Sequence, residues 1–537
     1  MSGFLRSTSV VGGFTLLSRV TGLLRDMVYS RMFGAGVLMD AFLVAFKIPN
    51  FMRRLFAEGA FSQAFVPVVS EYKVRNTHEE VRELVDGAAG TLAWFLALLT
   101  VVGVIIAPLL VLVFAPGFRA EAAKFDLTVE MLRWTFPYLL FISLTALAGG
   151  VLNSYGRFAV PAFTSTLLNL TMIVFAAWLA PGFERPGIAL AIGVFVAGVV
   201  QLAFQVPFML RLGLLRRPRW RWQHAGVRKI GRLMLPAIFG SSVSQVALLL
   251  DTLIASFLTT GSIAWLYYAD RLMEFPLGVF SIALATVILP GLAAHHAAQA
   301  PARFTATLDW ALRLTIIVVL PATLALVMLA GPLTVTIFHY GRFDENDVRM
   351  SSLALMAYAS GLLGFSLVKV LAPGFFARQD TRTPVRIGIQ SLGLNMGLNL
   401  AIVLPLALWH DRPGLHALLA LNNGIGAWYN SSMLYRGLRR QGVLRHAPGW
   451  RRLLLQVLVA SVLLCAFLWW LAGDTARWIA MGAWQRTQWM TLLVVGGGAI
   501  YFGTLWLLGL RFRDLRVRAP VAGAGTESDD GTGPRHP

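Results

Sequence analysis

The chain has 537 residues, of which 57% are hydrophobic and only 13% are charged, and its mean hydropathy is +0.67. This balance excludes a soluble globular protein and indicates a polytopic membrane protein. The formal charge of +20 does not point to nucleic acid, because the basic residues fall mostly in short clusters between apolar spans, as in the cytoplasmic loops of membrane proteins.

Apolar runs long enough to cross about 30 Å of hydrocarbon predict an all-α chain with about fourteen membrane helices. In the first half the predicted spans are approximately 8–33, 38–70, 88–115, 128–152, 160–180, 187–211 and 231–258. In the second half they are approximately 264–293, 310–331, 351–377, 386–409, 413–437, 452–472 and 488–510. The single cysteine, Cys465, lies within one of these spans, which excludes an intrachain disulfide.

Loop charge predicts the orientation of the spans. Basic clusters follow the sixth, twelfth and fourteenth spans, whereas the turns GAGVLM and TTGS, after the first and seventh spans, contain no basic residue. If the number of spans is even, the basic clusters share one side of the membrane, so both termini are expected in the cytoplasm. The polar tail 519–537 is expected to be disordered.

The chain also repeats itself weakly. Pro67 and Pro290 are 223 residues apart, and the same offset separates Pro161 from Pro384. Two landmarks with one offset predict two pseudo-symmetric six-helix lobes inserted in the same orientation, with two further helices after them. Bundles of this kind usually bind substrate between the lobes and rock one lobe against the other. The predicted domains are residues 1–215, 216–447 and 448–518.

Charged residues interrupt the first two spans, although an ionisable group near the middle of a bilayer costs a few kcal/mol. We therefore expect these side chains to face a cavity inside the protein. Guanidinium groups stay charged and bind two phosphate oxygens at once, so the arginines predict a site for an anion at membrane depth. The candidate residues of this stretch are Ser18, Arg19, Arg25, Asp26, Asp40, Arg53, Arg54 and Glu58.

Helical spacing predicts how these residues are arranged. Arg19 and Asp26 share one helical face, whereas Arg25 points elsewhere around the same helix. The alternative for Arg25 and Asp26 is a structural ion pair at the membrane interface. Both arrangements keep the charges out of the lipid, and the cost of an ionisable group inside the membrane favours the cavity.

In the second span, Arg54 and Glu58 have the spacing of an i, i+4 pair, which would leave Arg53 free for a ligand. The alternative is that Pro49 breaks the helix near an interface, where the charged side chains extend to the headgroups. We favour a ligand contact for Arg53.

The second half contains three charged residues at the start of span 8 and a lone acid in span 7. Asp270 and Glu274 are four residues apart with Arg271 between them, and they correspond to the charged part of span 2. The acid, Asp251, indicates either a coupling cation or proton, or a hydrogen bond to a neighbouring helix. No phosphate loop, zinc helix or nucleophile elbow supports an enzyme.

Two long stretches, SRVTGLLRDMVYSRMFGAG and DAFLVAFKIPNFMRRLFAEGAFSQAFVPVVSEY, closely resemble the MviN/MurJ-type lipid II flippases of bacterial cell-wall synthesis. ASFLTTGSIAWLYYADRLMEFPLGVF and KVLAPGFFARQDTRTPV are similar to other stretches of that family. The resemblance implies the fold of the multidrug/oligosaccharidyl-lipid/polysaccharide exporter (MOP) superfamily in the bacterial inner membrane. It also implies that lipid II, an undecaprenyl-diphosphate-linked disaccharide-pentapeptide, moves from the cytoplasmic to the periplasmic leaflet by alternating access, with no enzymatic reaction.

The resemblance further implies roles for individual residues. Cavity arginines would be Arg19, Arg25, Arg53 and Arg271, supported by the acids Asp26, Asp40, Glu58, Asp270 and Glu274. The last two helices would form a groove for the lipid tail. A sodium site of some relatives would use Asp251, but its partner positions, Leu392 and Met396, are apolar here, which leaves the membrane potential as the other source of energy.

The implied partners are lipid II, membrane phospholipids and the machinery of cell-wall synthesis and division, with no cofactor other than a coupling cation. Two alternatives stay open at this point. A cation-coupled exporter of drugs or oligosaccharide-lipids with the same fold would have acids and aromatic residues in its cavity. A polytopic prenyl-phosphate enzyme would change its lipid chemically.

Overall fold

The computed structural model describes residues 2–54, 61–214, 219–409 and 413–511, and all regular structure in these ranges is helical. The helices of the first half are α1 (Ser2–Phe33), α2 (Val37–Arg53), α3 (Ser62–Arg75), α4 (His78–Ile105), α5 (Ala107–Phe114), α6 (Ala122–Thr135), α7 (Tyr138–Ser154), α8 (Ala159–Val174) and α9 (Pro186–Arg211). Those of the second half are α10 (Ala225–Ala255), α11 (Ser262–Pro276), α12 (Ile282–Ala297), α13 (Pro301–Met328), α14 (Ala330–Phe338), α15 (Glu345–Phe376), α16 (Arg382–Leu398), α17 (Leu404–Trp409), α18 (His416–Arg440), α19 (Trp450–Ala472), α20 (Thr475–Ala480) and α21 (Ala483–Leu507).

In the described ranges, ten helical segments are long and apolar enough to cross a membrane. The other four predicted spans coincide with α1, with α2 and α3 together, with α10 and with α18, which this test of length and composition does not select. The all-α, multi-pass character is confirmed, whereas the count of fourteen stays a prediction.

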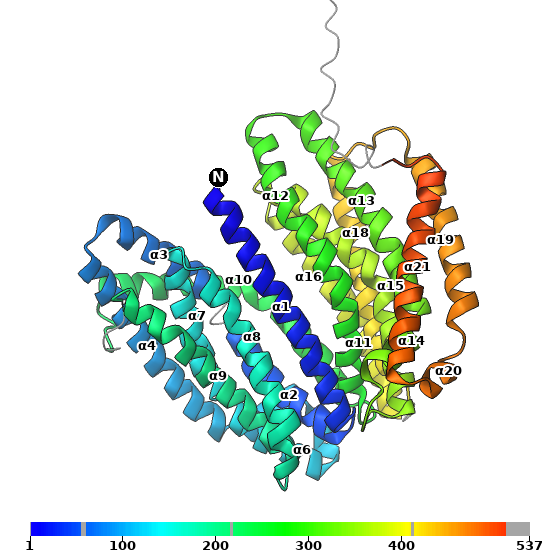
Figure 1. Cartoon of the computed structure of the whole chain (residues 1–537). Coiled ribbons are helices and arrows are strands. Elements are labelled where there is room, and N and C mark those ends of the chain that lie inside the picture. Colours follow the sequence, from blue (N-terminus) through cyan, green and yellow to red (C-terminus); the bar gives the residue numbers. More distant parts are fainter. Residues whose placement is uncertain (1, 55–60, 215–218, 410–412, 512–537) are drawn as a thin grey trace, which may run out of the picture.

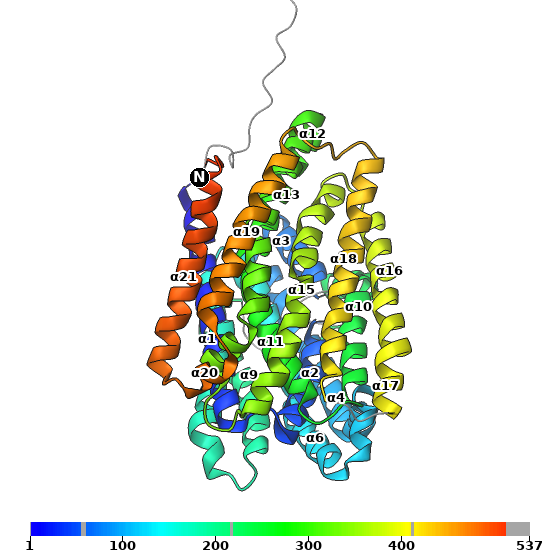
Figure 2. The same cartoon turned by 90° about the vertical axis from the view of Figure 1, so that its right-hand side faces the viewer.

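The helices form two groups that diverge toward one end of the molecule (Figure 1). The N-lobe contains α2 to α9 and the C-lobe contains α11 to α18, while α1 runs between them and packs along α8. Figure 2 shows α19 and α21 along one edge of the C-lobe, where α19 contacts α13. We call the end that carries the N-terminus, where the lobes diverge, the open end, and the opposite end the joined end.

The hydrophobic core differs between the two ends. At the joined end, one cluster of buried side chains includes both lobes, for example Met39 of the N-lobe and Tyr268 of the C-lobe. Toward the open end each lobe has its own cluster, one around Phe65 and one around Phe375. Val227 of α10 packs in the cluster of the N-lobe, so the lobe boundary predicted after residue 215 does not coincide with a break in packing.

Backbone contacts at glycines close the joined end. Gly34 and Gly341 have φ angles of +65° and +64°, a region that suits glycine. A Cβ added at Gly34 would lie 2.6 Å from the carbonyl oxygen of Arg342, and one at Gly341 would lie 2.3 Å from that of Arg31. The N–H of Arg342 donates to the carbonyl of Arg31 at 2.9 Å. The two lobes therefore touch backbone to backbone, with no room for a side chain.

A buried carboxylate of the N-lobe binds the start of a helix of the C-lobe. Asp40 accepts hydrogen bonds from the N–H groups of Gly261 at 2.7 Å and Ala264 at 2.9 Å, where the dipole of α11 favours an anion. Its Oδ2 also pairs with the ammonium of Lys124 at 2.9 Å, and Asp40 is only 1% exposed. The prediction that Asp40 supports a cavity site is corrected, because its oxygens are occupied in this seal.

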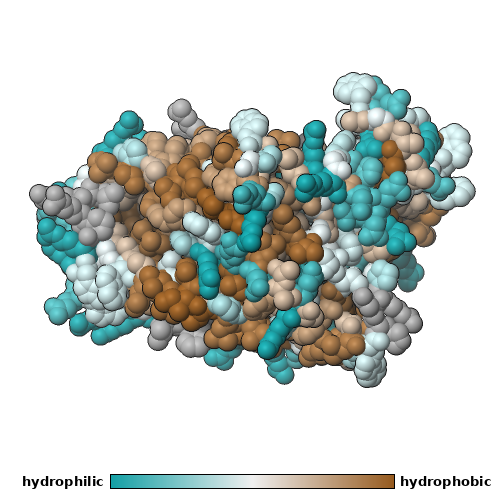
Figure 3. Space-filling view, turned by 90° about the horizontal axis from the view of Figure 1, so that it is seen from below, coloured by the Kyte–Doolittle hydropathy of each residue, from teal (hydrophilic) through white to brown (hydrophobic). Residues whose placement is uncertain are grey.

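The C-lobe provides the reciprocal contact. Asp347 of α15 accepts hydrogen bonds from the N–H of Ala35 at 3.2 Å and from the indole of Trp265 at 2.8 Å. The hydroxyl of Tyr268 donates to the carbonyl of Gly34 at 3.2 Å. Figure 3 views this end from below, with polar and apolar side chains covering the face across both lobes. The joined end is therefore sealed by both lobes.

The seal predicts that one added methyl group loosens the joined end. Gly34→Ala forces a Cβ against Arg342 in a strained conformation, whereas Gly36→Ala, the control, meets no atom within 4 Å. In a chain that carries Cys465→Ser and the buried reporter Ala264→Cys, we expect Gly34→Ala to raise the rate of labelling by a water-soluble maleimide about tenfold. Equal labelling rates in the two glycine variants would contradict the seal.

Candidate functional site

The centre of the molecule holds one carboxylate between two arginines. Asp26 of α1 is 0% exposed. Its Oδ1 lies 2.7 Å from Nη2 of Arg25, and its Oδ2 lies 2.7 Å from Nε of Arg271, which α11 brings from the C-lobe. The second contact is an ion pair without an aligned hydrogen bond. Two cations and one anion in a buried place leave a net positive charge between the lobes.

Arg25 is enclosed by hydrogen bonds. Its Nε and Nη2 donate to Asp26, its Nη1 donates to Asn169 at 3.1 Å and its Nη2 donates to the hydroxyl of Tyr267 at 2.8 Å. It is 6% exposed. The prediction that Arg25 points away from Asp26 is wrong, because the long side chain turns back onto the neighbouring carboxylate. In this conformation Arg25 supports the site from behind.

Two members of this cluster were not predicted. Asn169 of α8 donates its amide N–H to the carbonyl of Ser18 at 2.9 Å, which turns its oxygen toward Arg25. The amide is a polar group in an otherwise apolar span, which was the available signal. Tyr267 was assigned to the aromatic belt at the membrane surface, yet its hydroxyl donates to Asp26 at 2.7 Å. At Ser18 it is the backbone carbonyl, and not the predicted hydroxyl, that makes this contact.

Arg271 is the accessible member of the cluster. Its side chain is 33% exposed, and its Nη1 donates at 3.0 Å to Glu274, whose side chain is 48% exposed. Arg19 reaches the same region from α1, since a Cβ added at Gly278 of the C-lobe would lie 1.9 Å from its Nη1. The structure therefore brings Arg19, Arg271 and Glu274 together beside a space between the lobes that is open to solvent.

A second group of charges crosses between the lobes nearby. Asp270 interacts electrostatically with Lys47 and Arg54 of α2, and Lys47 also with Asp251. Lys47 was not a candidate, although its position in an apolar helix was a signal. These contacts join α2 to both α10 and α11.

The predicted site residues at the end of α2 have a different arrangement. The Nε of Arg53 donates to the side chain of Asn50 at 2.8 Å, so the prediction that Arg53 is free for a ligand is corrected. Arg54 is exposed. Its predicted partner, Glu58, lies outside the described residues.

Asp251 lies in a cluster of asparagines. Its two oxygens accept hydrogen bonds from Asn399 at 3.3 Å and from Asn423 at 3.1 Å. Asn395 bonds to both of these asparagines, and Asn422 donates to Asn399 at 2.7 Å. One carboxylate and several amide oxygens are hard ligands of the kind that alkali and alkaline-earth cations prefer. Rotation of the amides would turn their oxygens toward such a cation.

This cluster corrects the partner positions assigned from the sequence. Leu392 and Met396 do not meet Asp251; the partners in this part of the chain stand three residues further along. The segment Asn399–Val403 is π-helical, as is Phe175–Leu179, which begins 224 residues earlier in the N-lobe. Such segments are frequent at functional sites. They also fit the predicted repeat, whose offset is nearly the same.

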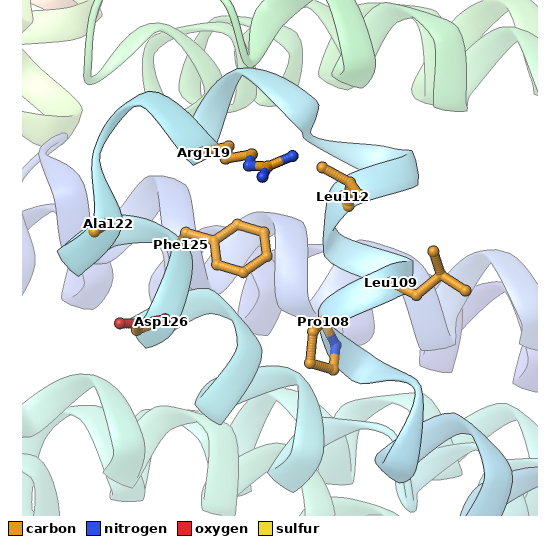
Figure 4. A pocket seen from close by; sticks show the side chains of 7 residues that line it. All are labelled: Pro108, Leu109, Leu112, Arg119, Ala122, Phe125 and Asp126. Atoms are coloured by element: carbon orange, nitrogen blue, oxygen red, sulfur yellow. The ribbon is translucent and has the colours of Figure 1, made fainter.

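Figure 4 shows a pocket of about 400 Å³ between α5 and α6 at the joined end, with mostly apolar walls and the side chains of Arg119 and Asp126. None of the predicted site residues lines it. It does not belong to the charged site between the lobes.

Comparison with known proteins identifies relatives along nearly the whole chain. A model of the lipid II flippase MurJ family matches residues 29–486. The probable lipid II flippase MurJ of Vibrio cholerae is 44% identical over 520 residues, covering 96% of this chain and 98% of that protein. The lipid II flippase MurJ of Burkholderia cenocepacia is 43% identical over 520 residues, with coverage of 96% and 99%.

Solved structures agree at the level of the fold. A lipid II flippase MurJ in an inward closed conformation has a TM-score of 0.78 at 22% identity, covering 94% of this chain and 99% of that one. An inward-facing multidrug resistance MATE family transporter of the MOP superfamily has a TM-score of 0.62 at 16% identity, with coverage of 81% and 98%. The chain therefore belongs to the MurJ family of lipid II flippases.

Proposed function

We propose that the chain carries lipid II from the cytoplasmic to the periplasmic leaflet of the bacterial inner membrane by alternating access. Membership of the family supports the substrate. The observation that carries the mechanism is that Arg25 and Arg271, one from each lobe, meet at the single carboxylate of Asp26. Phospholipids surround the chain, and we expect the enzymes that make and polymerise lipid II to work on either side of it.

The charge of the loops supports an orientation. Most loop arginines lie at the open end, which by the positive-inside rule faces the cytoplasm, together with both termini. The described structure is then closed toward the periplasm and open toward the cytoplasm. The basic residues of this end include Arg75, Arg211, Arg219, Arg228, Lys229, Arg303, Arg439, Arg440, Arg445, Arg451 and Arg452.

The diphosphate is the part of the substrate that hydrocarbon excludes, because an unpaired ion there is very costly. From the open end it first meets Arg19 and Arg271, whose guanidiniums can each bind two of its oxygens. The diphosphate then takes the place of Asp26 and Glu274 as the partner of Arg271. This exchange weakens the ion pair between the lobes and lets them move.

The opposite state requires the joined end to open. Asp40 and Asp347 then release the N–H groups of the other lobe, and the lobes close at the cytoplasmic end behind the headgroup. The prenyl chain stays in the lipid beside the last two long helices. Their exposed apolar side chains support this placement, for example Leu455 and Leu458 of α19 and Val494 and Val495 of α21.

This function predicts that Arg271 is needed for transport. Arg271→Ala removes charged hydrogen bonds, so we expect transport to fall about tenfold or more. Arg271→Lys should be intermediate, since it keeps the charge and loses the paired geometry. Arg185→Ala, whose exposed ion pair with Glu130 lies outside the site, is the control. The measurements are complementation of a flippase-depleted strain and leaflet accessibility of labelled lipid II in proteoliposomes.

The same assay separates a flippase from an enzyme. Labelled lipid II extracted after the reaction should be chemically unchanged. Wild-type transport by Arg271→Ala would contradict the proposed anion site, and a modified lipid would favour the prenyl-phosphate enzyme.

We further propose that Asp251 and its asparagines bind a monovalent cation that is coupled to transport. An inside-negative potential would add to this, because it draws an emptied cationic site inward at about 2.3 kcal/mol per charge per 100 mV. The cluster joins α10 to the C-lobe through Asn399 and Asn423. A cation bound there would strengthen that junction.

The cation proposal predicts sodium-dependent stability. Sodium chloride should raise the melting temperature of the purified protein above that in choline chloride at equal ionic strength, because binding to the folded state stabilises it. Asp251→Asn should abolish the difference, whereas Asp126→Asn, at an exposed acid, should keep it. A sodium effect that survives Asp251→Asn would place the cation elsewhere.

A further inference from the structure

The hydroxyl oxygen of Tyr267 lies between the arginines of the two lobes. It accepts a hydrogen bond from Nη2 of Arg25 at 2.8 Å and another from Nη2 of Arg271 at 3.3 Å. Its own proton points to Oδ1 of Asp26 at 2.7 Å. A phenol oxygen has two lone pairs, so both are used by guanidinium groups, one from each lobe.

Two guanidiniums that share one oxygen form an arrangement suited to an oxyanion. The cluster is also incompletely satisfied, because Nε of Arg271 and Oδ2 of Asp26 are buried and make no aligned hydrogen bond. Buried polar atoms without a hydrogen bond are rare in native proteins and call for an explanation. A ligand that rearranges this cluster is such an explanation.

We propose that Tyr267 is a positioning residue whose hydroxyl holds the place of one diphosphate oxygen while the site is empty. This inference rests on the proposed function. The hydroxyl keeps the two arginines at a separation at which both reach one oxygen, and it leaves when the diphosphate arrives. Tyr267 therefore prepares the site and also competes with the substrate, so that only an anion with several oxygens displaces it.

The ring of Tyr267 is held independently of its hydroxyl. It packs edge to face on Tyr268 with ring centroids 5.6 Å apart, and the guanidinium of Arg271 lies 5.3 Å from its centroid. Tyr267→Phe keeps these contacts and removes only the competing oxygen. Asn169 is the opposite case, because it holds Arg25 from within the N-lobe through Nη1 and does not occupy the shared position between the arginines.

The test is the affinity of the purified full-length protein for inorganic pyrophosphate, measured by calorimetry, together with its melting temperature. We expect Tyr267→Phe to bind pyrophosphate about tenfold more tightly, the factor of one charged hydrogen bond, while melting at a lower temperature. Asn169→Leu should bind it about tenfold more weakly. Tyr138→Phe, which removes a buried hydroxyl near Gln201 in the N-lobe, should leave affinity unchanged.

The direction of the change separates this role from a structural one. A hydroxyl that only supports the fold would lower affinity and stability together when removed. If Tyr267→Phe binds pyrophosphate as the wild type does, or more weakly, Tyr267 does not hold the place of an oxygen, and the proposed function still stands. If the wild type does not bind pyrophosphate, the anion site of the proposed function fails and this inference fails with it.

Discussion

The structure depends on one buried carboxylate that faces an arginine from each lobe. A carboxylate without a partner inside a membrane protein is costly, and so is an unpaired guanidinium. Asp26 therefore stabilises Arg25 and Arg271 only while the lobes are close at that level. An anion from solvent can replace it as the partner of Arg271. The charge balance at the centre thus links the occupancy of the site to the separation of the lobes.

The joined end has a different chemistry, which suits a seal that must open again. Its contacts are hydrogen bonds of the backbone and two carboxylates, Asp40 and Asp347, that bind N–H groups of the opposite lobe. When the lobes part there, water can replace each of these partners at little net cost. The lobes also share a buried apolar cluster at this end, so opening must separate or repack its two halves. The centre selects the substrate, and the joined end decides which side is accessible.

Much of the fold followed from apolar runs and from the proline offset, because membrane length and the repeat are encoded locally. Charges in apolar spans identified Asp26 and Arg271 for the same reason. Asp40 was misplaced because its partners are distant in the chain and its position alone resembles that of a cavity acid. Tyr267 resembled an interfacial tyrosine, since exposure depends on packing. The contact of Asn399 depends on a π-helical segment, which ordinary helical spacing does not reveal.

The most direct test is an experimental structure of the full-length protein with lipid II bound between the lobes. The account predicts diphosphate oxygens within hydrogen-bond distance of the Arg271 guanidinium, with the Asp26–Arg271 ion pair broken. A bound lipid II whose diphosphate lies away from Arg271, with that ion pair intact, would contradict it.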